Sequence, residues 1–147
     1  MKIPKYIEFH NETNYVLSRF LKAAKPKEGC AILIGQKKTS KTDFRTLYWE
    51  VNHIWNCQNI WGDPESKLIN QNMGVFSKQK HLRLSKNNRF EIDAKDQIAS
   101  QRWARENNLE VLCYAHSHPS GENKPSEIDL LLHQSPGLMI ISNKDGV

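Results

Sequence analysis

Two histidines separated by a single residue, His116 and His118, are the side chains of this sequence best suited to binding a metal ion. Asp129 follows eleven positions after the second histidine and adds a carboxylate. Two imidazole nitrogens and one carboxylate oxygen are typical of a catalytic zinc site, in which three protein ligands leave a fourth position for water. The residue types therefore indicate one zinc ion per chain and a hydrolase that uses a zinc-activated water.

The order of residues around the histidines would bring these ligands together. His116 and His118 are two positions apart, which puts their side chains on the same face of an extended chain. Pro119 fixes the backbone directly after them and has no N–H for a strand ladder. The polar stretch 120–125 predicts a turn that reverses the chain. We expect Asp129, in the first turn of the next predicted helix, to point back toward the histidines.

Each of these signals also has a purely structural interpretation. A His-x-His pair is common at exposed strand ends, where it binds nothing. Ser126 followed by Asp129 fits a helix-capping pattern, with the serine as N-cap and an acid three residues later. Cys113 is a further candidate ligand, but a cysteine in an apolar strand is more often buried as a small hydrophobic side chain. Only the combination of signals favours a metal site.

The hydrophobic pattern predicts alternating helices and strands, which is typical of an α/β sandwich. Apolar residues at helical spacing indicate a first helix over 11–24, with Asn11 as its N-cap and Pro26 ending it. Short apolar runs predict buried strands, one ending at Gly35 and a later one with the two histidines just beyond its end. The predicted strands are 30–34, 44–55 (one long strand or two), 89–92, 111–115 and 138–142, and the further helices are 94–107 and 126–133.

Between residues 63 and 88 the regular pattern fails. This stretch is rich in Gly, Pro, Asn and Lys and predicts a long loop, which we expect to be flexible. Its basic part, 78–89, is either a solvated surface or a contact for an acidic partner. The sequence has neither an internal repeat nor a domain linker, so we expect a single domain over 1–147.

The composition suits one globular domain of 147 residues, with 38% hydrophobic and 25% charged residues. No apolar run approaches the roughly 20 residues needed to span a membrane, and the N-terminus lacks the apolar core of a secretory signal. Three cysteines without zinc-finger spacing predict reduced thiols and a cytoplasmic location. The basic residues behind the net charge of +5 are scattered, so we expect a solvated surface and no binding to nucleic acid or membrane.

At this combination of residues the chain resembles the JAMM family, the MPN-domain zinc metallopeptidases, and in particular their small single-domain members from bacteria. The signature of that family is His-x-His-Pro, six residues, and then Ser-x-x-Asp, which the chain matches without insertion or deletion at His116, His118, Pro119, Ser126 and Asp129. The family also has a glutamate before its first buried strand, and the segment from Glu28 to Gly35 resembles it. The resemblance implies an α/β, MPN-like sandwich in which helices flank a mixed, curved β-sheet.

The resemblance also implies a role for each residue of the site. His116, His118 and Asp129 would hold the zinc. Glu28 would act as general base, taking a proton from the attacking water and delivering it to the leaving amine. Ser126 would donate a hydrogen bond to the developing oxyanion. Family members cleave peptide or isopeptide bonds after the C-terminal tail of a ubiquitin-like protein, and small bacterial members trim ubiquitin-like sulfur-carrier proteins, so we expect such a protein as substrate.

Two other functions remain open at the level of sequence. The first is a non-catalytic MPN-like scaffold that binds a ubiquitin-like partner, although inactive relatives typically lack the ligands that this chain keeps. The second is a zinc hydrolase acting on a small molecule or nucleobase, but the deaminase type needs a Pro-Cys-x-x-Cys element that the sequence lacks. The sequence also ends at Val147, earlier than is usual for the family. We expect that a missing edge strand would favour a homodimer.

Overall fold

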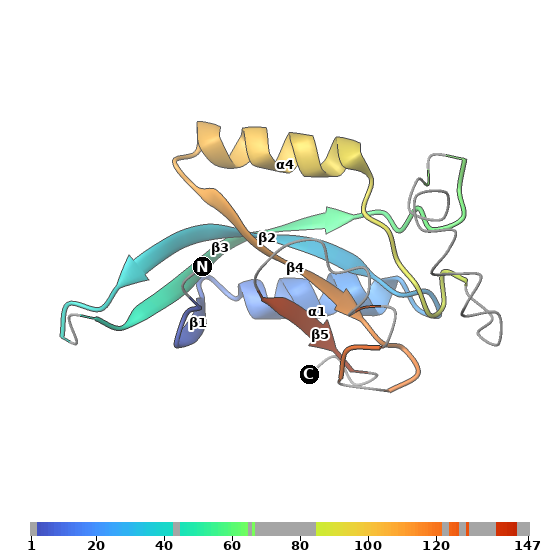
Figure 1. Cartoon of the computed structure of the whole chain (residues 1–147), viewed down its shortest axis with the longest axis horizontal. Coiled ribbons are helices and arrows are strands. Elements are labelled where there is room, and N and C mark those ends of the chain that lie inside the picture. The colour runs from blue at the N-terminus through green and yellow to red at the C-terminus, as the bar shows by residue number, and fades with distance from the viewer. Residues whose placement is uncertain are drawn as a thin grey trace.

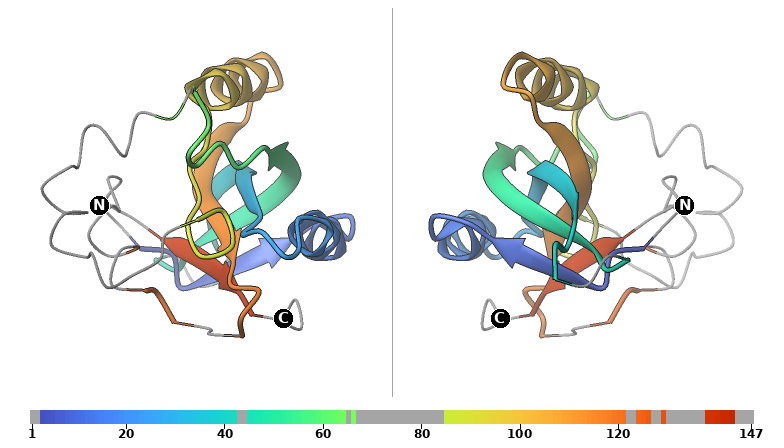
Figure 2. Two further views of the ribbon diagram at one scale, coloured as in Figure 1. Left: turned by 90° about the vertical axis from the view of Figure 1, so that its right-hand side faces the viewer. Right: turned by 90° about the vertical axis from the view of Figure 1, so that its left-hand side faces the viewer.

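The histidine pair is carried by a five-stranded β-sheet that has one helix packed on each face (Figures 1 and 2). The computed structural model describes residues 3–42, 45–64, 66, 85–121, 124–126, 129 and 138–143. The elements are β1 (Tyr6–Phe9), α1 (Thr13–Ala23), β2 (Cys30–Thr39), β3 (Leu47–Cys57), α4 (Ala94–Glu106), β4 (Glu110–Ser117) and β5 (Met139–Ser142). The predicted α/β architecture, a mixed curved sheet with flanking helices, is confirmed.

The strand order is β1-β3-β2-β4-β5. The central strand β2 is antiparallel to both of its neighbours, β3 and β4. The two outer strands, β1 and β5, are parallel to the strands that they join. β4, which carries His116 and leads directly into His118, lies between the central strand and the outer strand β5.

The sheet is covered on both faces, which explains why β2 begins with a continuous apolar run. Alternate residues of a strand face opposite sides, so Ala31 and Leu33 pack with Leu17 and Leu21 of α1. The residues that alternate with them, Cys30, Ile32 and Ile34, pack on the opposite face with Ala104 of α4. Figure 2 shows the two helices on opposite sides of the sheet. Burial on both faces makes the start of β2 a rigid support for the site beside it.

The prediction that the first buried strand ends at Gly35 is wrong, because β2 continues to Thr39. The pairing with β3 shifts register between Ile34 and Gly35, as in a β-bulge. At this point a Cβ built on Gly35 would lie 1.8 Å from the backbone oxygen of Glu50. Gly35 therefore permits a close approach of two strands and does not terminate one.

Other boundaries differ from the prediction for reasons of pairing. β4 extends to Ser117, so His116 is inside the strand and only His118 follows it. Residues 89–92 form no strand; the structure has only an isolated bridge between Asn59 and Ile92. The outer strand β1 was not predicted, since its four residues gain regular structure only by pairing with β3.

The helix predictions are confirmed in the part of the chain that is described. α4 spans Ala94–Glu106, with the side chain of Asp93 as N-cap accepting from the N–H of Lys95 at 3.0 Å. α1 spans Thr13–Ala23, but Asn11 is not its N-cap: Glu12 holds that position with a positive φ, and no side chain caps the helix. Most of the predicted loop 63–88 and of the predicted helix 126–133 lies outside the described residues. Neither α1 nor α4, the helices of the described part, is long and apolar enough to cross a membrane.

Candidate metal centre

The histidines are joined to the glutamate segment by backbone and side-chain hydrogen bonds. His116 lies opposite Cys30 in the β2–β4 pairing, on the face of the sheet toward α4. The next residue, Ser117, donates its N–H to the oxygen of Gly29 at 3.0 Å, and its Oγ accepts from the N–H of Gly29 at 2.8 Å. These two bonds fix the segment that carries Glu28 directly beside the histidines.

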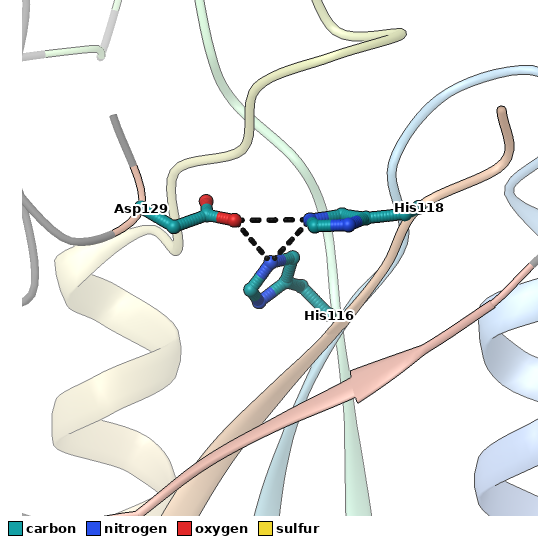
Figure 3. A group of neighbouring side chains, drawn as sticks. All are labelled: His116, His118 and Asp129. Atoms are coloured by element: carbon teal, nitrogen blue, oxygen red, sulfur yellow. Dashed lines mark hydrogen bonds and ion pairs between the residues drawn. The ribbon is translucent and has the colours of Figure 1, made fainter. Parts of the chain in front are cut away.

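Three candidate ligand atoms from His116, His118 and Asp129 converge on one point (Figure 3). The Nε2 atoms of the two histidines are 3.0 Å apart, and the Oδ2 atom of Asp129 lies 3.1 Å from the first and 2.9 Å from the second. The three residues are 1%, 5% and 2% exposed. The structure therefore brings together, in a buried position, the three residues that the sequence predicts as ligands.

This triangle fits a metal ion better than it fits hydrogen bonds alone. Two neutral imidazoles can each donate an Nε2–H to Oδ2 of Asp129, but then no hydrogen lies between the two nitrogens, which are only 3.0 Å apart. In a tetrahedral zinc site with bonds of about 2.0–2.1 Å, neighbouring ligand atoms are separated by about 3.3 Å. The observed 2.9–3.1 Å is slightly shorter. Two imidazoles and one carboxylate are also a donor set that zinc prefers.

The charge states of the ligands suit a cation. Burial lowers the pKa of His116, against the opposing pull of Asp129, so the imidazole is neutral near pH 7 and has a lone pair to donate. Burial alone would raise the pKa of Asp129, but hydrogen bonds with His116 and His118 outweigh it and hold that pKa well below its usual range. The Nδ1 atom of His116 has no hydrogen-bond partner among the described residues. Its ring is held by stacking on Phe90, with centroids 4.4 Å apart.

Glu28 is buried beside this triangle. Only 4% of the residue is exposed, and its Oε1 atom lies 3.8 Å from Nε2 of His118. Its backbone is held from both sides, since its N–H donates to the oxygen of Lys86 at 2.6 Å and its own oxygen accepts from Nδ2 of Asn59 at 2.9 Å. The Oε2 atom has no hydrogen-bond partner among the described residues. Within the described part of the chain, no other group therefore competes for this oxygen.

Burial raises the pKa of Glu28 to about 8, and the nearby carboxylate of Asp129 contributes to the rise. The charges of Arg89 and His118 act in the opposite direction. A carboxyl group with a pKa near neutrality is suited to exchanging protons with a reactant. A divalent cation bound beside it would favour the ionised form.

The structure places Ser126 in contact with Asp129 through its backbone and its hydroxyl. The N–H of Ser126 donates to Oδ2 of Asp129 at 2.9 Å, and Oγ of Ser126 accepts from the N–H of Asp129 at 3.0 Å. This reciprocal arrangement is the capping pattern that the sequence suggested. It holds Asp129 in place, while the predicted role of Ser126 as an oxyanion donor stays a prediction.

Sequence reasoning missed two residues that pack around the site. Arg89 is 2% exposed, and its Nη1 atom lies 2.6 Å from Oδ1 of Asp129. Asn59 accepts through Oδ1 from the N–H groups of Trp61 and Glu91, in addition to its bond with the backbone of Glu28. The sequence contains no local signal for either role, because Asp129 is 40 residues from Arg89 and Glu28 is 31 residues from Asn59.

A second group of potential ligands, Glu8, His10 and Glu50, lies elsewhere in the sheet. Here the ammonium group of Lys38 donates to Oε2 of Glu50 at 2.7 Å. This hydrogen bond is the main reason why the pKa of Glu50 is lowered. Lys38 already pairs with Glu50, and the side chain of Glu8 is half exposed, so we interpret the group as an ion-pair network at the surface.

A comparison with protein families is consistent with this geometry. The model of the prokaryotic homologs of the JAB domain matches residues 10–147. The chain belongs to this family. The predicted relationship to small bacterial JAMM/MPN-type domains is therefore confirmed, and the mixed sheet with its two helices is a JAB/MPN fold. A search of curated proteins found no match.

Solved structures share the JAB-like fold. The solution structure of protein DSY2949 from Desulfitobacterium hafniense has a TM-score of 0.60 and 19% identity, and the match covers 90% of this chain and 73% of that one. The solution structure of a protein from Salinibacter ruber has a TM-score of 0.53 and 20% identity, with coverage of 95% and 75%. At these identities the likeness concerns the fold alone.

Proposed function

We propose that this JAB-domain protein is a zinc-dependent metallopeptidase. Its substrate would be a ubiquitin-like or sulfur-carrier protein, in which it would cleave a peptide or isopeptide bond after the C-terminal tail. The observation that carries the proposal is the convergence of ligand atoms from His116, His118 and Asp129 at 2.9–3.1 Å. The carboxyl group of Glu28 lies 3.8 Å from Nε2 of His118. A buried triad of zinc ligands next to a buried acid is the arrangement that metal-assisted hydrolysis requires.

Each residue has a distinct task in this mechanism. His116, His118 and Asp129 would hold zinc, which when bound lowers the pKa of a water molecule and polarises a carbonyl group. Glu28 accepts a proton from the attacking water and returns it to the leaving amine. Its Oε2 atom, which has no hydrogen-bond partner in the described part of the chain, and its raised pKa both support this exchange. The bonds to Lys86 and Asn59 hold the backbone of Glu28 still while the proton moves.

The substrate tail must reach the site as an extended chain. In the described part of the sheet, β5 is the outermost strand on the side of the histidines. Pairing of an extended peptide with an outer strand is a common binding mode, because backbone hydrogen bonds supply affinity for any sequence. Ser126 would then donate a hydrogen bond to the oxyanion that forms at the scissile carbonyl.

The test is cleavage of a panel of ubiquitin-like and sulfur-carrier proteins, each carrying a C-terminal extension, followed by intact mass spectrometry. We expect the zinc-loaded protein to release the extension. Glu28→Gln should retain zinc and lower the rate by about 10²–10⁴-fold, because the amide cannot act as a base. Glu106→Gln, at an exposed position in α4, is the matched control and should cleave at the unchanged rate.

Two results would contradict the proposal. If the zinc-loaded protein binds a panel member but cleaves none, the non-catalytic scaffold is the better interpretation. If Glu28→Gln cleaves as fast as the unsubstituted protein, Glu28 is not the base.

A further inference from the structure

Arg89 is a buried cation that contacts the candidate metal centre from the side away from the histidines. Its Nη1 atom lies 2.6 Å from Oδ1 of Asp129, while the other oxygen, Oδ2, faces His116 and His118. The side chains of Arg89 and Asp129 are 3% and 0% exposed. One oxygen of the carboxylate thus meets the guanidinium group, while the other faces the imidazoles and also accepts from the N–H of Ser126 at 2.9 Å.

The guanidinium group of Arg89 is itself held in place. Nη2 donates to the oxygen of Phe90 at 3.3 Å, and the group lies over the rings of Trp61 and Phe90, 5.4 Å and 5.1 Å from their centroids. The backbone of Arg89 is fixed as well, because its oxygen accepts from Asn59 at 2.9 Å and its N–H donates to the oxygen of Ser85 at 2.8 Å. A group fixed in this way presents its donor to Asp129 in one orientation only.

The orientation of a carboxylate decides how it binds a metal. A free carboxylate turns about its terminal bond and presents either one oxygen or both to a cation. An ion pair with arginine is directional, since the N–H groups of the planar guanidinium point along fixed lines. With Oδ1 held by Nη1, only Oδ2 is left to face the two imidazoles.

We propose that Arg89 is a positioning residue that acts through Asp129: it sets the carboxylate so that a single oxygen meets the metal. This inference rests on the proposed zinc site and concerns metal affinity rather than cleavage. Outer partners that orient metal ligands typically change metal affinity by about 10–100-fold when they are removed. A purely structural arginine, which only fastens the segment around residue 89 to the core, would change stability and leave the affinity of the folded protein unchanged.

The experiment measures the zinc Kd of the folded protein by competition with a chromophoric chelator. We expect Arg89→Gln to raise the Kd by about 10–100-fold. Arg89→Lys should give an intermediate Kd, because the ammonium restores a charge but not the fixed fork. Arg102→Gln, which removes an exposed arginine of α4, is the matched control and should leave the Kd unchanged. The cobalt form of Arg89→Gln should also show a changed visible absorption spectrum, which reports on ligand geometry.

A double-mutant cycle tests whether Arg89 affects zinc binding through Asp129. If Arg89 acts through Asp129, Arg89→Gln should weaken zinc binding far less in an Asp129→Ala protein than in the unsubstituted one. Should Arg89→Gln fail to fold, Arg89→Lys and its cycle with Asp129→Ala provide the same comparison.

The inference is overturned if the folded Arg89 variants bind zinc with the Kd of the unsubstituted protein, or if the unsubstituted protein does not bind zinc. An unsubstituted protein that binds zinc tightly but cleaves no substrate would contradict the proposed function alone. In that case the Kd values of the Arg89 variants still decide whether Arg89 positions Asp129.

Discussion

Asp129 shows how much one side chain depends on its neighbours. Its Oδ2 atom faces His116 and His118, its Oδ1 atom is paired with Arg89, and its backbone N–H is capped by Ser126. Two of these contacts were predicted from spacing, and the pairing with arginine was not. At the scale of the residue, the candidate site includes the partners that hold Asp129, namely Arg89 and Ser126, as well as Asp129 itself.

A prediction at the same scale concerns the buried thiols. Burial raises the pKa of Cys113 from 9.0 to about 12. Above pH 9 the unfolded chain therefore releases a proton that the folded protein keeps, so the free energy of unfolding falls as pH rises toward 12. One such thiol contributes a loss of about 1 kcal/mol at pH 10. Urea unfolding at pH 8 and pH 10 should show a smaller fall in Cys113→Ala than in the unsubstituted protein.

The control for this comparison is Leu112→Ala, which shortens the neighbouring buried side chain without removing a titratable group. Its fall between the two pH values should equal that of the unsubstituted protein. Equal falls in all three proteins would show that the thiol of Cys113 does not ionise differently in the folded and unfolded states.

At the scale of the element, the pairing of β2 with its neighbours fixes the end of β2 that lies next to Glu28. β2 is paired on both sides, and its first residue, Cys30, lies opposite both Cys57 and His116. The bulge after Ile34 allows β2 to remain paired with β3 past Gly35. The strand that supports Glu28 at one end is thus longer and more firmly paired than an apolar run of five residues suggests.

Gly35→Ala should reveal the importance of this close approach. The added Cβ would lie 1.8 Å from the oxygen of Glu50, so the two strands would have to separate. We expect a loss of at least about 1–3 kcal/mol in the free energy of unfolding, measured in urea. Gln36→Ala, at the next position of β2, is the control and should cost clearly less. A Gly35→Ala protein as stable as this control would show that the bulge relaxes without cost.

At the scale of the whole molecule, the candidate site is assembled from segments that are far apart in the chain. Glu28 precedes β2, and Arg89 precedes α4. The histidines lie at the end of β4 and just beyond it, and Asp129 follows later in the chain. The fold brings these segments together at one end of β2 and β4, and Asn59 joins two of them by accepting and donating hydrogen bonds. A metal ion bound by His116, His118 and Asp129 would stabilise the folded state, because only folding brings the three ligands together.

Zinc should therefore raise the melting temperature. At a free zinc concentration about 1,000 times the Kd, binding adds about 4 kcal/mol to the free energy of unfolding. For a chain of this size that corresponds to a rise in Tm of about 8–16 °C, measurable by calorimetry with zinc and with a chelator. Glu28→Gln should keep the rise, since Glu28 is not a ligand, and His116→Ala should lose it. A similar rise in His116→Ala would place the zinc elsewhere.

The sequence by itself determined the identity of the candidate ligands, the acid beside them, the family and the positions of α1, α4 and β5. The ligands and the elements follow from local spacing: helical periodicity, apolar runs and a motif whose residues lie within one short segment. Glu28 and the family follow instead from the resemblance of the chain to the JAMM signature. Only the tertiary structure decided the full length of β2, the existence of β1, and the places of Arg89 and Asn59 at the site. Each of those features depends on a partner that is distant in the chain. An outer strand needs a neighbouring strand, and a buried cation needs a counter-charge, and only folding brings these partners into contact.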